Sequence, residues 1–460
     1  MNIETDRYKI SIEKIREGGP SGYESVYLVS EGNPASKDLY DILAGFKGKL
    51  LPADNNVIRQ RNGQALTSSL KEGRSVGIAS GFKPSGAYHF GHKLTSETVS
   101  FFQKNGARVF IPVADIECSM DSRLSRAQYQ FWAADNLLDW GANGVNLDAA
   151  HVYLQSEEFR VSTLSYIVAR SLNFKFAVDI YGAEKLISDF PFLFAGITQV
   201  GDILLPQHQE FNNYHSFMVS GQDQDGHMKM TTALTQATLD SGIGLLGVQT
   251  VPSGFYIPHI RGVSGEKASS SRAESTIYLG EGPNMEDLTE RIRSSLRKID
   301  KADKEHLSRC SLDMVRYLDF FNQRSRVSFK ELCAEPIYQH LVDLLETART
   351  KEKQKKAQND MDNFLINRCK DQGQDNIEIA RDSLPEALTE HQKKREIILY
   401  YAKTRVREAT VFSREKDIEA MQPIKPDFWQ IPDSAVVNES KRNTTQWFHI
   451  VNKMADQICP

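Results

Sequence analysis

Two histidines in one glycine-rich turn are the residues of this chain best suited to chemistry on a phosphate. His89 and His92 close the stretch 80–92, which also contains three glycines, Gly81, Gly86 and Gly91. Glycine lets the backbone approach a ligand closely, and two imidazoles at this spacing can reach the same phosphate group. A glycine-rich turn alone is equally an ordinary strand-to-helix connection, so this interpretation depends on the paired histidines.

The turn lies between two regular elements. The apolar run at 76–79 predicts a buried strand, and residues 94–102 predict a helix. Strand, turn and helix form the first unit of a parallel α/β sheet, in which phosphates commonly bind at the helix N-terminus.

The same alternation continues downstream. Residues 107–115 and 151–155 predict two further strands, and between them a helix carries Ala134, Leu137 and Leu138 on one face and is expected to stop at Gly141. Strands separated by helix-length segments indicate an α/β fold with a doubly wound parallel sheet, a Rossmann-like domain over residues 76–284. Such sheets bind ligands at the carboxyl ends of their strands, where the histidine turn is expected.

Two polar clusters interrupt apolar sequence after the third strand. In 198–206, Gln199 and Asp202 stand among apolar residues, and a buried carboxylate needs either a ligand or a hydrogen-bond donor, with about even odds between the two. The run 220–227 follows a strand-like segment, and its Asp223 can accept hydrogen bonds from a ribose. Taken alone, this second run is equally a plain surface loop.

A third cluster combines a cation with hydroxyls. Lys267 precedes Ser269, Ser270 and Ser271, and such a loop can close on a triphosphate and neutralise charge on leaving pyrophosphate. A serine-rich linker is the alternative. The order of the three clusters behind the histidine turn, within one α/β domain, favours a nucleotide site.

Outside this domain the chain divides into three further regions. Residues 1–75 are expected to form an N-terminal appendage, with a short strand at 23–30. Residues 285–411 read as mostly helical and carry basic clusters at 291–298, 349–356 and 393–407. Each cluster alone suggests a solvated face, and together they favour a polyanion partner. Residues 412–460 form a C-terminal extension whose last helix places Trp447, Ile450, Val451 and Met454 on one stripe, more typical of packed core than of a partner site.

Composition excludes several classes of protein. A length of 460 residues favours two or three domains, and a formal net charge of −4 gives no global sign of nucleic-acid binding. Five scattered cysteines argue against a zinc site and a disulfide framework, and favour the cytoplasm. No apolar run approaches the ~20 residues of a membrane span, and the N-terminus lacks the features of a secretory signal.

Together these motifs resemble those of the class I aminoacyl-tRNA synthetases, and within them the archaeal tryptophan–tRNA ligases. His89-Phe90-Gly91-His92, preceded by Pro84-Ser85-Gly86, is similar to the family's His-Ile-Gly-His signature, and residues 267–271 are similar to its Lys-Met-Ser-Lys-Ser signature. Residues 199–204 and 223–225 resemble the tryptophan branch. The chain departs from the pattern at Ala268, in place of methionine, and at Ala79, where some tryptophan enzymes carry an aromatic residue.

The resemblance implies a reaction and a set of sites. It implies activation of tryptophan by Mg-ATP and transfer to tRNA, with residues 76–284 as the catalytic domain and residues 285–411 holding the anticodon. It also implies a homodimer and no metal site made by the protein itself. The catalytic residues it implies are His89, His92, Lys267, Ser269, Ser270 and Ser271. The ATP-binding residues are Gly81, Pro84, Ser85, Gly86, His89, Gly91, His92, Gly221, Asp223 and Lys267. The amino-acid-binding residues are Glu117, Gln199, Asp202 and Gln224, with Asp202 accepting from the indole N–H.

Three alternatives stay open at this point. A tyrosine–tRNA ligase shares the class and differs in the pocket. A nucleotidylyltransferase shares the histidine turn but has no need of a basic helical domain. A synthetase-like paralogue can keep the fold as a binding or regulatory module, although the intact His89, His92 and Lys267 weigh against this.

Overall fold

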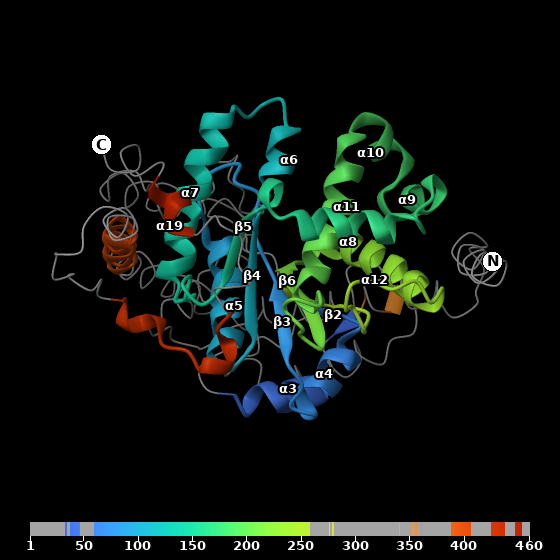
Figure 1. Ribbon diagram of the computed structural model, residues 1–460, viewed down its shortest axis with the longest axis horizontal. Coiled ribbons are helices and arrows are strands. Elements are labelled where there is room, and N and C mark those ends of the chain that lie inside the picture. Colours follow the sequence, from blue (N-terminus) through green and yellow to red (C-terminus); the bar gives the residue numbers. More distant parts are fainter. Residues whose placement is uncertain are drawn as a thin grey trace.

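A seven-stranded sheet forms the centre of the computed structural model (Figure 1). The structure describes residues 33–34, 37–46, 59–257, 388–405, 425–437 and 447–452, with isolated positions between 276 and 360. The strand order is β1-β2-β7-β6-β3-β4-β5. Five strands run parallel: β3 (Val76–Ala79), β4 (Arg108–Val113), β5 (His151–Leu154), β6 (His215–Gly221) and β7 (Ser253–Ile257). Two antiparallel strands, β2 (Arg59–Arg61) and β1 (Asn33–Pro34), extend the sheet beyond β7.

The order of the parallel strands creates a switch point in the middle of the sheet. The chain passes from β3 outward to β4 and β5, then returns to place β6 on the other side of β3. Two connections that leave neighbouring strands in opposite directions open a crevice at the carboxyl ends, here between β3 and β6. This arrangement confirms the expected doubly wound, Rossmann-like domain.

Helices cover both faces of the sheet. On one face lie α4 (Gly63–Lys71), α5 (Phe90–Lys104) and α7 (Arg126–Ala142), with α3 (Lys37–Ala44) beside α4. On the other lie α8 (Phe159–Ala169), α9 (Phe174–Tyr181), α10 (Ala183–Ser188), α11 (Pro191–Leu204) and α12 (Asp225–Asp240). Among the described helices, none is both long and apolar enough to cross a membrane.

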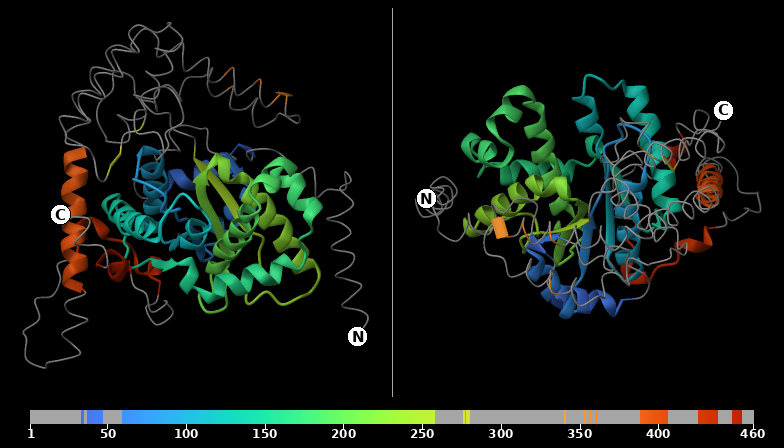
Figure 2. Two further views of the ribbon diagram at one scale, coloured as in Figure 1. Left: turned by 90° about the horizontal axis from the view of Figure 1, so that it is seen from above. Right: turned by 180° about the vertical axis from the view of Figure 1, so that it is seen from behind.

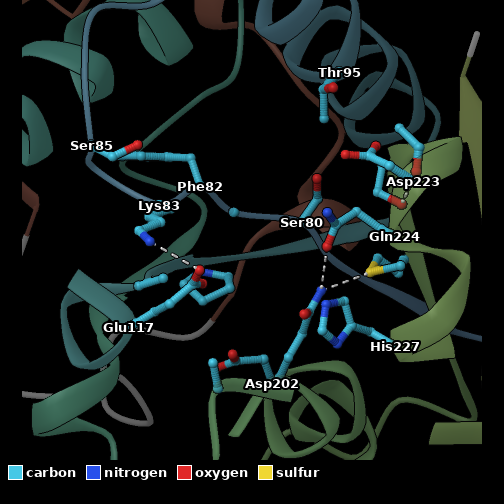
Figure 3. Close-up of a pocket in the computed structure, with 18 of the residues that line it drawn as sticks. Ser80, Phe82, Lys83, Ser85, Thr95, Glu117, Asp202, Asp223, Gln224 and His227 are labelled. Carbon is cyan, nitrogen blue, oxygen red and sulfur yellow. Dashed lines mark hydrogen bonds and ion pairs between the residues drawn. The ribbon is translucent and has the colours of Figure 1, made fainter. Parts of the chain in front are cut away.

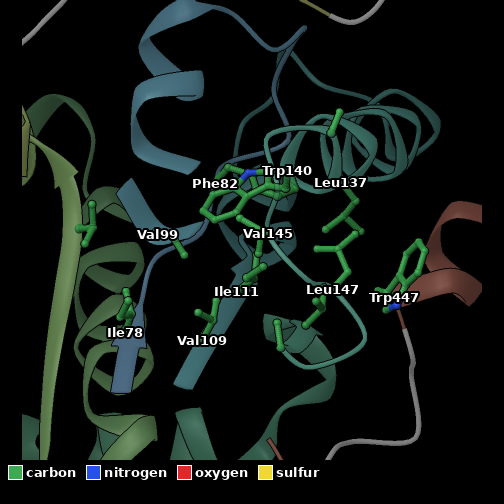
Figure 4. Close-up of a cluster of buried hydrophobic side chains, with 14 of the residues drawn as sticks. Ile78, Phe82, Val99, Val109, Ile111, Leu137, Trp140, Val145, Leu147 and Trp447 are labelled. Atoms are coloured by element: carbon green, nitrogen blue, oxygen red, sulfur yellow. The ribbon is translucent and has the colours of Figure 1, made fainter. Parts of the chain in front are cut away.

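The alternation of side chains along β4 explains the two cores. Val109 and Ile111 point into the core shared with α5 and α7 (Figure 4). Val113 belongs to the same core, whereas Phe110 belongs to the core shared with α8 and α11. Successive residues of a strand face opposite sides, so a strand covered by helices on both sides is apolar throughout. The continuous apolar runs in the sequence follow from this burial.

One helix end differs from the expectation. Gly141 does not stop its helix, because α7 continues to Ala142. A Cβ at position 141 would lie 2.8 Å from Cδ1 of Ile398 and 2.9 Å from Cζ2 of Trp429. The glycine therefore leaves room for two side chains that are remote in sequence.

The described parts of the C-terminal extension belong to the main core. Trp429 is fully buried, and its Nε1 donates to the Gly141 carbonyl oxygen at 3.0 Å. Helix α19 (Trp447–Asn452) packs on α7, and Nε1 of Trp447 donates to Asp148 at 2.9 Å. The expectation that the terminal stripe is a packed face is confirmed for Trp447, Ile450 and Val451, while Met454 lies outside the described residues.

A helix at residues 388–405 packs beside this extension (Figure 2). Its Arg395 was predicted as part of a basic cluster, but it is buried and pairs with Asp135 and Asp139 of α7. His391 also contacts Asp139, at 2.7 Å. Arg395 therefore holds the helix against α7 and is not a solvent-facing cation.

Several expectations fall where the structure gives no description. The strand predicted at 23–30 and the basic cluster at 291–298 lie outside the described residues. The domain boundaries near residues 75, 284 and 411 stay predictions.

Candidate active site

A cavity of about 720 Å³ opens at the switch point of the sheet (Figure 3). Its walls come from the turn after β3, the start of α5, the middle of α11, and the turn between β6 and α12. The cavity lies where parallel α/β sheets hold their ligands. Most residues that the sequence singled out line it, namely Gly81, Ser85, His89, Gly91, His92, Glu117, Gln199, Asp202, Gly221, Asp223 and Gln224.

The two histidines are fixed by the first turn of α5. His89 is the N-cap, and its Nδ1 accepts from the Gly91 N–H at 3.1 Å. The backbone N–H of His89 in turn donates to Nδ1 of His92 at 3.3 Å, and the two rings stack with centroids 3.8 Å apart. Both imidazoles therefore lie at the positive end of a helix dipole, a favourable place for an anion.

The glycines and the proline of the turn differ in whether they line the cavity. A Cβ on Gly81 would collide with the carbonyl oxygen of Pro112, so close packing on β4 requires this glycine. Pro84 and Gly86 were predicted to contact ATP, but they are buried and are not among the residues that line the cavity. The Gly86 carbonyl oxygen instead accepts from Asn136 Nδ2 at 3.3 Å. These two residues shape the turn from behind.

The turn opposite the histidines presents amides and a carboxylate. It comprises η4 (Gln222–Gln224) after Gly221, and it brings Asp223 and Gln224 to the cavity. Nε2 of Gln199, from α11, lies 3.4 Å from Oε1 of Gln224 (Figure 3). This contact brings together two residues that the sequence assigned to amino-acid binding.

Asp202 lies at the inner wall of the cavity and is only 2% exposed. Its Oδ1 accepts from the Tyr153 hydroxyl at 2.8 Å, and its Oδ2 accepts from Gln155 Nε2 at 2.6 Å. Burial raises the pKa of Asp202 to about 7, although these two hydrogen bonds oppose the rise. A carboxyl group in this state can accept one more hydrogen bond from a ligand that reaches it.

A charged cluster at the cavity edge was not recognised from the sequence. Lys83 Nζ lies 3.3 Å from Glu117 and 3.2 Å from Asp121, and Asp121 also pairs with Arg123 at 2.8 Å. Partial burial alone lowers the pKa of Lys83, but the two carboxylates outweigh this effect and raise it. Glu117, predicted to bind the amino acid, is thus already engaged by a cation. The position of Lys83 within the histidine turn was the available signal.

His227 is a second lining residue that the sequence did not identify as a site residue. Its Nδ1 lies 2.8 Å from the Tyr181 hydroxyl, and its ring packs near Phe192. Burial lowers the pKa of His227 to about 4, so the ring is neutral at pH 7. His227 and Phe192 together give this end of the cavity aromatic walls.

The lysine–serine loop falls outside the described residues, so Lys267, Ser269, Ser270 and Ser271 are not placed. The chain on either side is described. Ile257, at the end of β7, lines the cavity. Tyr278 forms an antiparallel bridge with His89, and the Leu279 N–H donates to the Tyr88 carbonyl oxygen at 2.8 Å.

A doubly wound sheet with a helix N-terminus and a polar turn facing one crevice defines an α/β protein of the nucleotide-binding class. The family model described as tRNA synthetases class I (W and Y) matches residues 71–365, well over half of the chain. The chain belongs to this family.

Individual relatives agree with the family assignment. The tryptophan–tRNA ligase of Methanocaldococcus jannaschii is 29% identical over 248 residues, which is 53% of this chain and 65% of the relative. The match therefore spans slightly less than two thirds of that protein.

Solved structures share the fold. A tryptophanyl-tRNA synthetase from Aeropyrum pernix aligns with a TM-score of 0.55 at 24% identity, over 78% of this chain and 88% of that one. A tyrosyl-tRNA synthetase from the same organism aligns with a TM-score of 0.54 at 18% identity, over 81% and 98%. The fold alone therefore does not separate the tryptophan and tyrosine branches.

Proposed function

We propose that the protein is a tryptophan–tRNA ligase that forms tryptophanyl-adenylate from tryptophan and ATP and transfers tryptophan to tRNA. One observation carries the proposal: His89 and His92 lie at the start of α5, and Asp223 and Gln224 line the same cavity from the turn after β6. The printed name of the relative from Methanocaldococcus jannaschii supports tryptophan as the amino acid.

In the first step, a carboxylate oxygen of tryptophan attacks the α-phosphorus of Mg-ATP. A new phosphorus–oxygen bond forms as the bond to the bridging oxygen breaks, and pyrophosphate leaves with that electron pair. No covalent intermediate with the protein is required, so rate enhancement comes from positioning and charge stabilisation. His89 and His92 contact the phosphates from the positive end of α5, and Asp223 accepts from the ribose hydroxyls.

The amino acid occupies the inner end of the cavity. Asp202, which is 2% exposed, accepts from the indole N–H, while Gln199 and Gln224 hold the indole or the α-amino group. Phe192 and His227 flank the ring system. A buried acceptor left without its donor rejects phenylalanine strongly. Glu117, which lines the same cavity, is a further candidate for the α-amino group.

Lys267 completes the site by neutralising the leaving pyrophosphate. It stands ten positions after Ile257 and eleven before Tyr278. Both flanking residues belong to the cavity region, Ile257 as a lining residue and Tyr278 through its bridge to His89. A segment tethered at both ends near the histidines supports a role for Lys267 on the same triphosphate.

In the second step, a ribose hydroxyl of the terminal adenosine of tRNA attacks the carbonyl carbon of the adenylate. An ester bond forms, and AMP leaves. The basic residues within 285–411 attract the tRNA backbone. The scattered cysteines favour the cytoplasm as the compartment.

We also propose that two copies associate through the helices α8 to α11. Six large apolar side chains there are 48–80% exposed: Phe159, Tyr166, Phe174, Ile187, Phe190 and Phe194. These helices gather on one side of the molecule (Figure 1). Exposed aromatic residues at this density mark an interaction surface, and a second copy is the occupant that the family favours.

The direct test is the exchange of labelled pyrophosphate into ATP in the presence of tryptophan or tyrosine. We expect exchange that depends on tryptophan. Exchange with tyrosine alone would move the protein to the other branch of the family. Gel retention of transcribed tRNA separates a ligase from a nucleotidylyltransferase, because only the ligase must bind tRNA.

A further inference from the structure

A buried ion pair lies behind the cavity, next to the turn that presents Asp223 and Gln224. Arg61, the last residue of β2, donates from Nε to Oδ1 of Asp225 at 2.6 Å and from Nη2 to Oδ2 at 2.7 Å. The Tyr256 hydroxyl donates to the same Oδ1 at 2.7 Å. The side chains of Arg61 and Asp225 are 3% and 4% exposed. None of these three residues lines the cavity.

The carboxylate of this ion pair directly follows the turn that faces the ligand. Asp225 is the first residue of α12 and directly follows Gln224. Gln222 and Gln224 of η4 are half-buried and Asp223 is exposed, so none of the three side chains is anchored in the core as Asp225 is. No side-chain cap hydrogen bond supports the start of α12 either. The bidentate contact from Arg61 is therefore the strongest fixed point on this side of the turn.

Arg61 itself is held by the sheet. It pairs with Gly254 in the antiparallel register between β2 and β7, and β7 pairs with β6, whose end leads into the turn. The guanidinium thus connects β2, the antiparallel strand next to β7, to the start of α12. A planar fork with two parallel hydrogen bonds fixes orientation as well as distance, which a lysine cannot do.

We propose that Arg61 is a positioning residue for adenylate formation: through Asp225 it holds the turn that places Asp223 and Gln224 against the nucleotide and the amino acid. This inference rests on the proposed function. It assigns a role in the reaction to the antiparallel strand β2, which contributes no residue to the cavity.

A merely structural role for Arg61 is the alternative, because removing it leaves a buried carboxylate without its main partner. Two variants separate the two roles. Arg61→Met leaves Asp225 buried with Tyr256 and with Lys229, whose Nζ lies 3.6 Å from Oδ2. The double variant Arg61→Met/Asp225→Leu removes both charges, so it relieves the unpaired carboxylate while the turn stays without its anchor.

Arg395→Met is the matched control. Arg395 is as buried as Arg61 and also pairs with carboxylates, those of Asp135 and Asp139. None of these residues lines the cavity or adjoins the turn. The control therefore reports the general effect of losing a buried ion pair.

The experiment measures ATP affinity by titration calorimetry on the full chain, at a temperature where every variant is folded by circular dichroism. We expect Arg61→Met and the double variant each to weaken ATP binding about tenfold or more, since small displacements of positioning groups have effects of this order. Arg395→Met should stay within about twofold of the wild type. If Arg61→Met binds ATP with wild-type affinity, or if the double variant recovers that affinity, Arg61 has only a structural role.

The same titration separates this inference from the proposed function. A wild-type protein that binds ATP but exchanges no pyrophosphate with tryptophan refutes the tryptophan–tRNA ligase proposal, while the comparison of ATP affinities still decides whether Arg61 positions the turn for the nucleotide. A wild-type protein that binds no ATP refutes both.

Discussion

The replacement Asp202→Asn tests the chemistry assigned to the inner wall of the cavity. Burial raises the pKa of Asp202 from 3.8 to about 7, so between these pH values the folded protein holds a proton that the unfolded chain has released. Stability therefore falls as the pH rises through this interval and is constant above it. At 1.36 kcal/mol per pH unit, the full effect is about 4 kcal/mol, as an order of magnitude.

Asparagine has the same shape and no charge, so this pH dependence disappears in the variant. Its Oδ1 still accepts from Tyr153, and the amide of Gln155 can rotate to present its oxygen. We expect the free energy of unfolding of the variant, relative to the wild type, to rise by about 2 kcal/mol between pH 5 and pH 7 and to stay level above pH 8. Equilibrium urea denaturation of both proteins at each pH measures this difference.

Asp121→Asn is the control at the same cavity. Hydrogen bonds from Arg123 are the largest of the effects that lower the pKa of Asp121, so its charge is constant from pH 5 to pH 8, and its difference from the wild type should be level there. A level difference for Asp202→Asn as well would show that Asp202 is ionised throughout and that the reasoning from burial is wrong. In the wild type alone, the KM for tryptophan should fall as the pH rises through about 7, because the carboxylate is the better acceptor for the indole N–H.

Three further outcomes follow. Lys267→Ala should slow pyrophosphate exchange far more than it weakens tryptophan binding measured by calorimetry, and equal losses in both would contradict its assignment to pyrophosphate. Trp429→Ala removes a fully buried ring from the contact with Gly141 and should lower the free energy of unfolding by about 3–5 kcal/mol, whereas unchanged urea denaturation would mean that the C-terminal extension is an accessory. Phe194→Glu, in α11, should convert a dimer into monomers in sedimentation velocity. Tyr400→Glu, exposed on the helix at 388–405, is the control and should leave the dimer intact. If both variants are monomeric, or both are dimeric, the proposed interface is refuted.

The sequence predicted the architecture because the parallel strands are buried on both faces. The continuous apolar run Val76–Ala79, for example, forms strand β3 with the predicted ends. The place of the histidine turn at the carboxyl ends of the strands also followed from the sequence, whereas the switch point depends on the strand order that only the structure shows. Local patterns of this kind depend on a few neighbouring residues.

Contacts between distant segments could not be predicted in the same way. Arg61 and Asp225 are 164 positions apart, and no local pattern connects them. Gly141 was predicted to end a helix. The structure shows instead that a glycine is needed there because Trp429 and Ile398, which are remote in sequence, pack against it. Arg395 looked solvated within a basic run, since its partners Asp135 and Asp139 lie on another helix.

Pyrophosphate exchange measured with each of the twenty amino acids is the most direct test of the claim that this cavity makes an aminoacyl-adenylate. We expect tryptophan to support exchange well above every other amino acid, and the His89→Ala and His92→Ala variants to lose most of that rate. A protein that binds ATP and yet shows no exchange with any amino acid would contradict the claim.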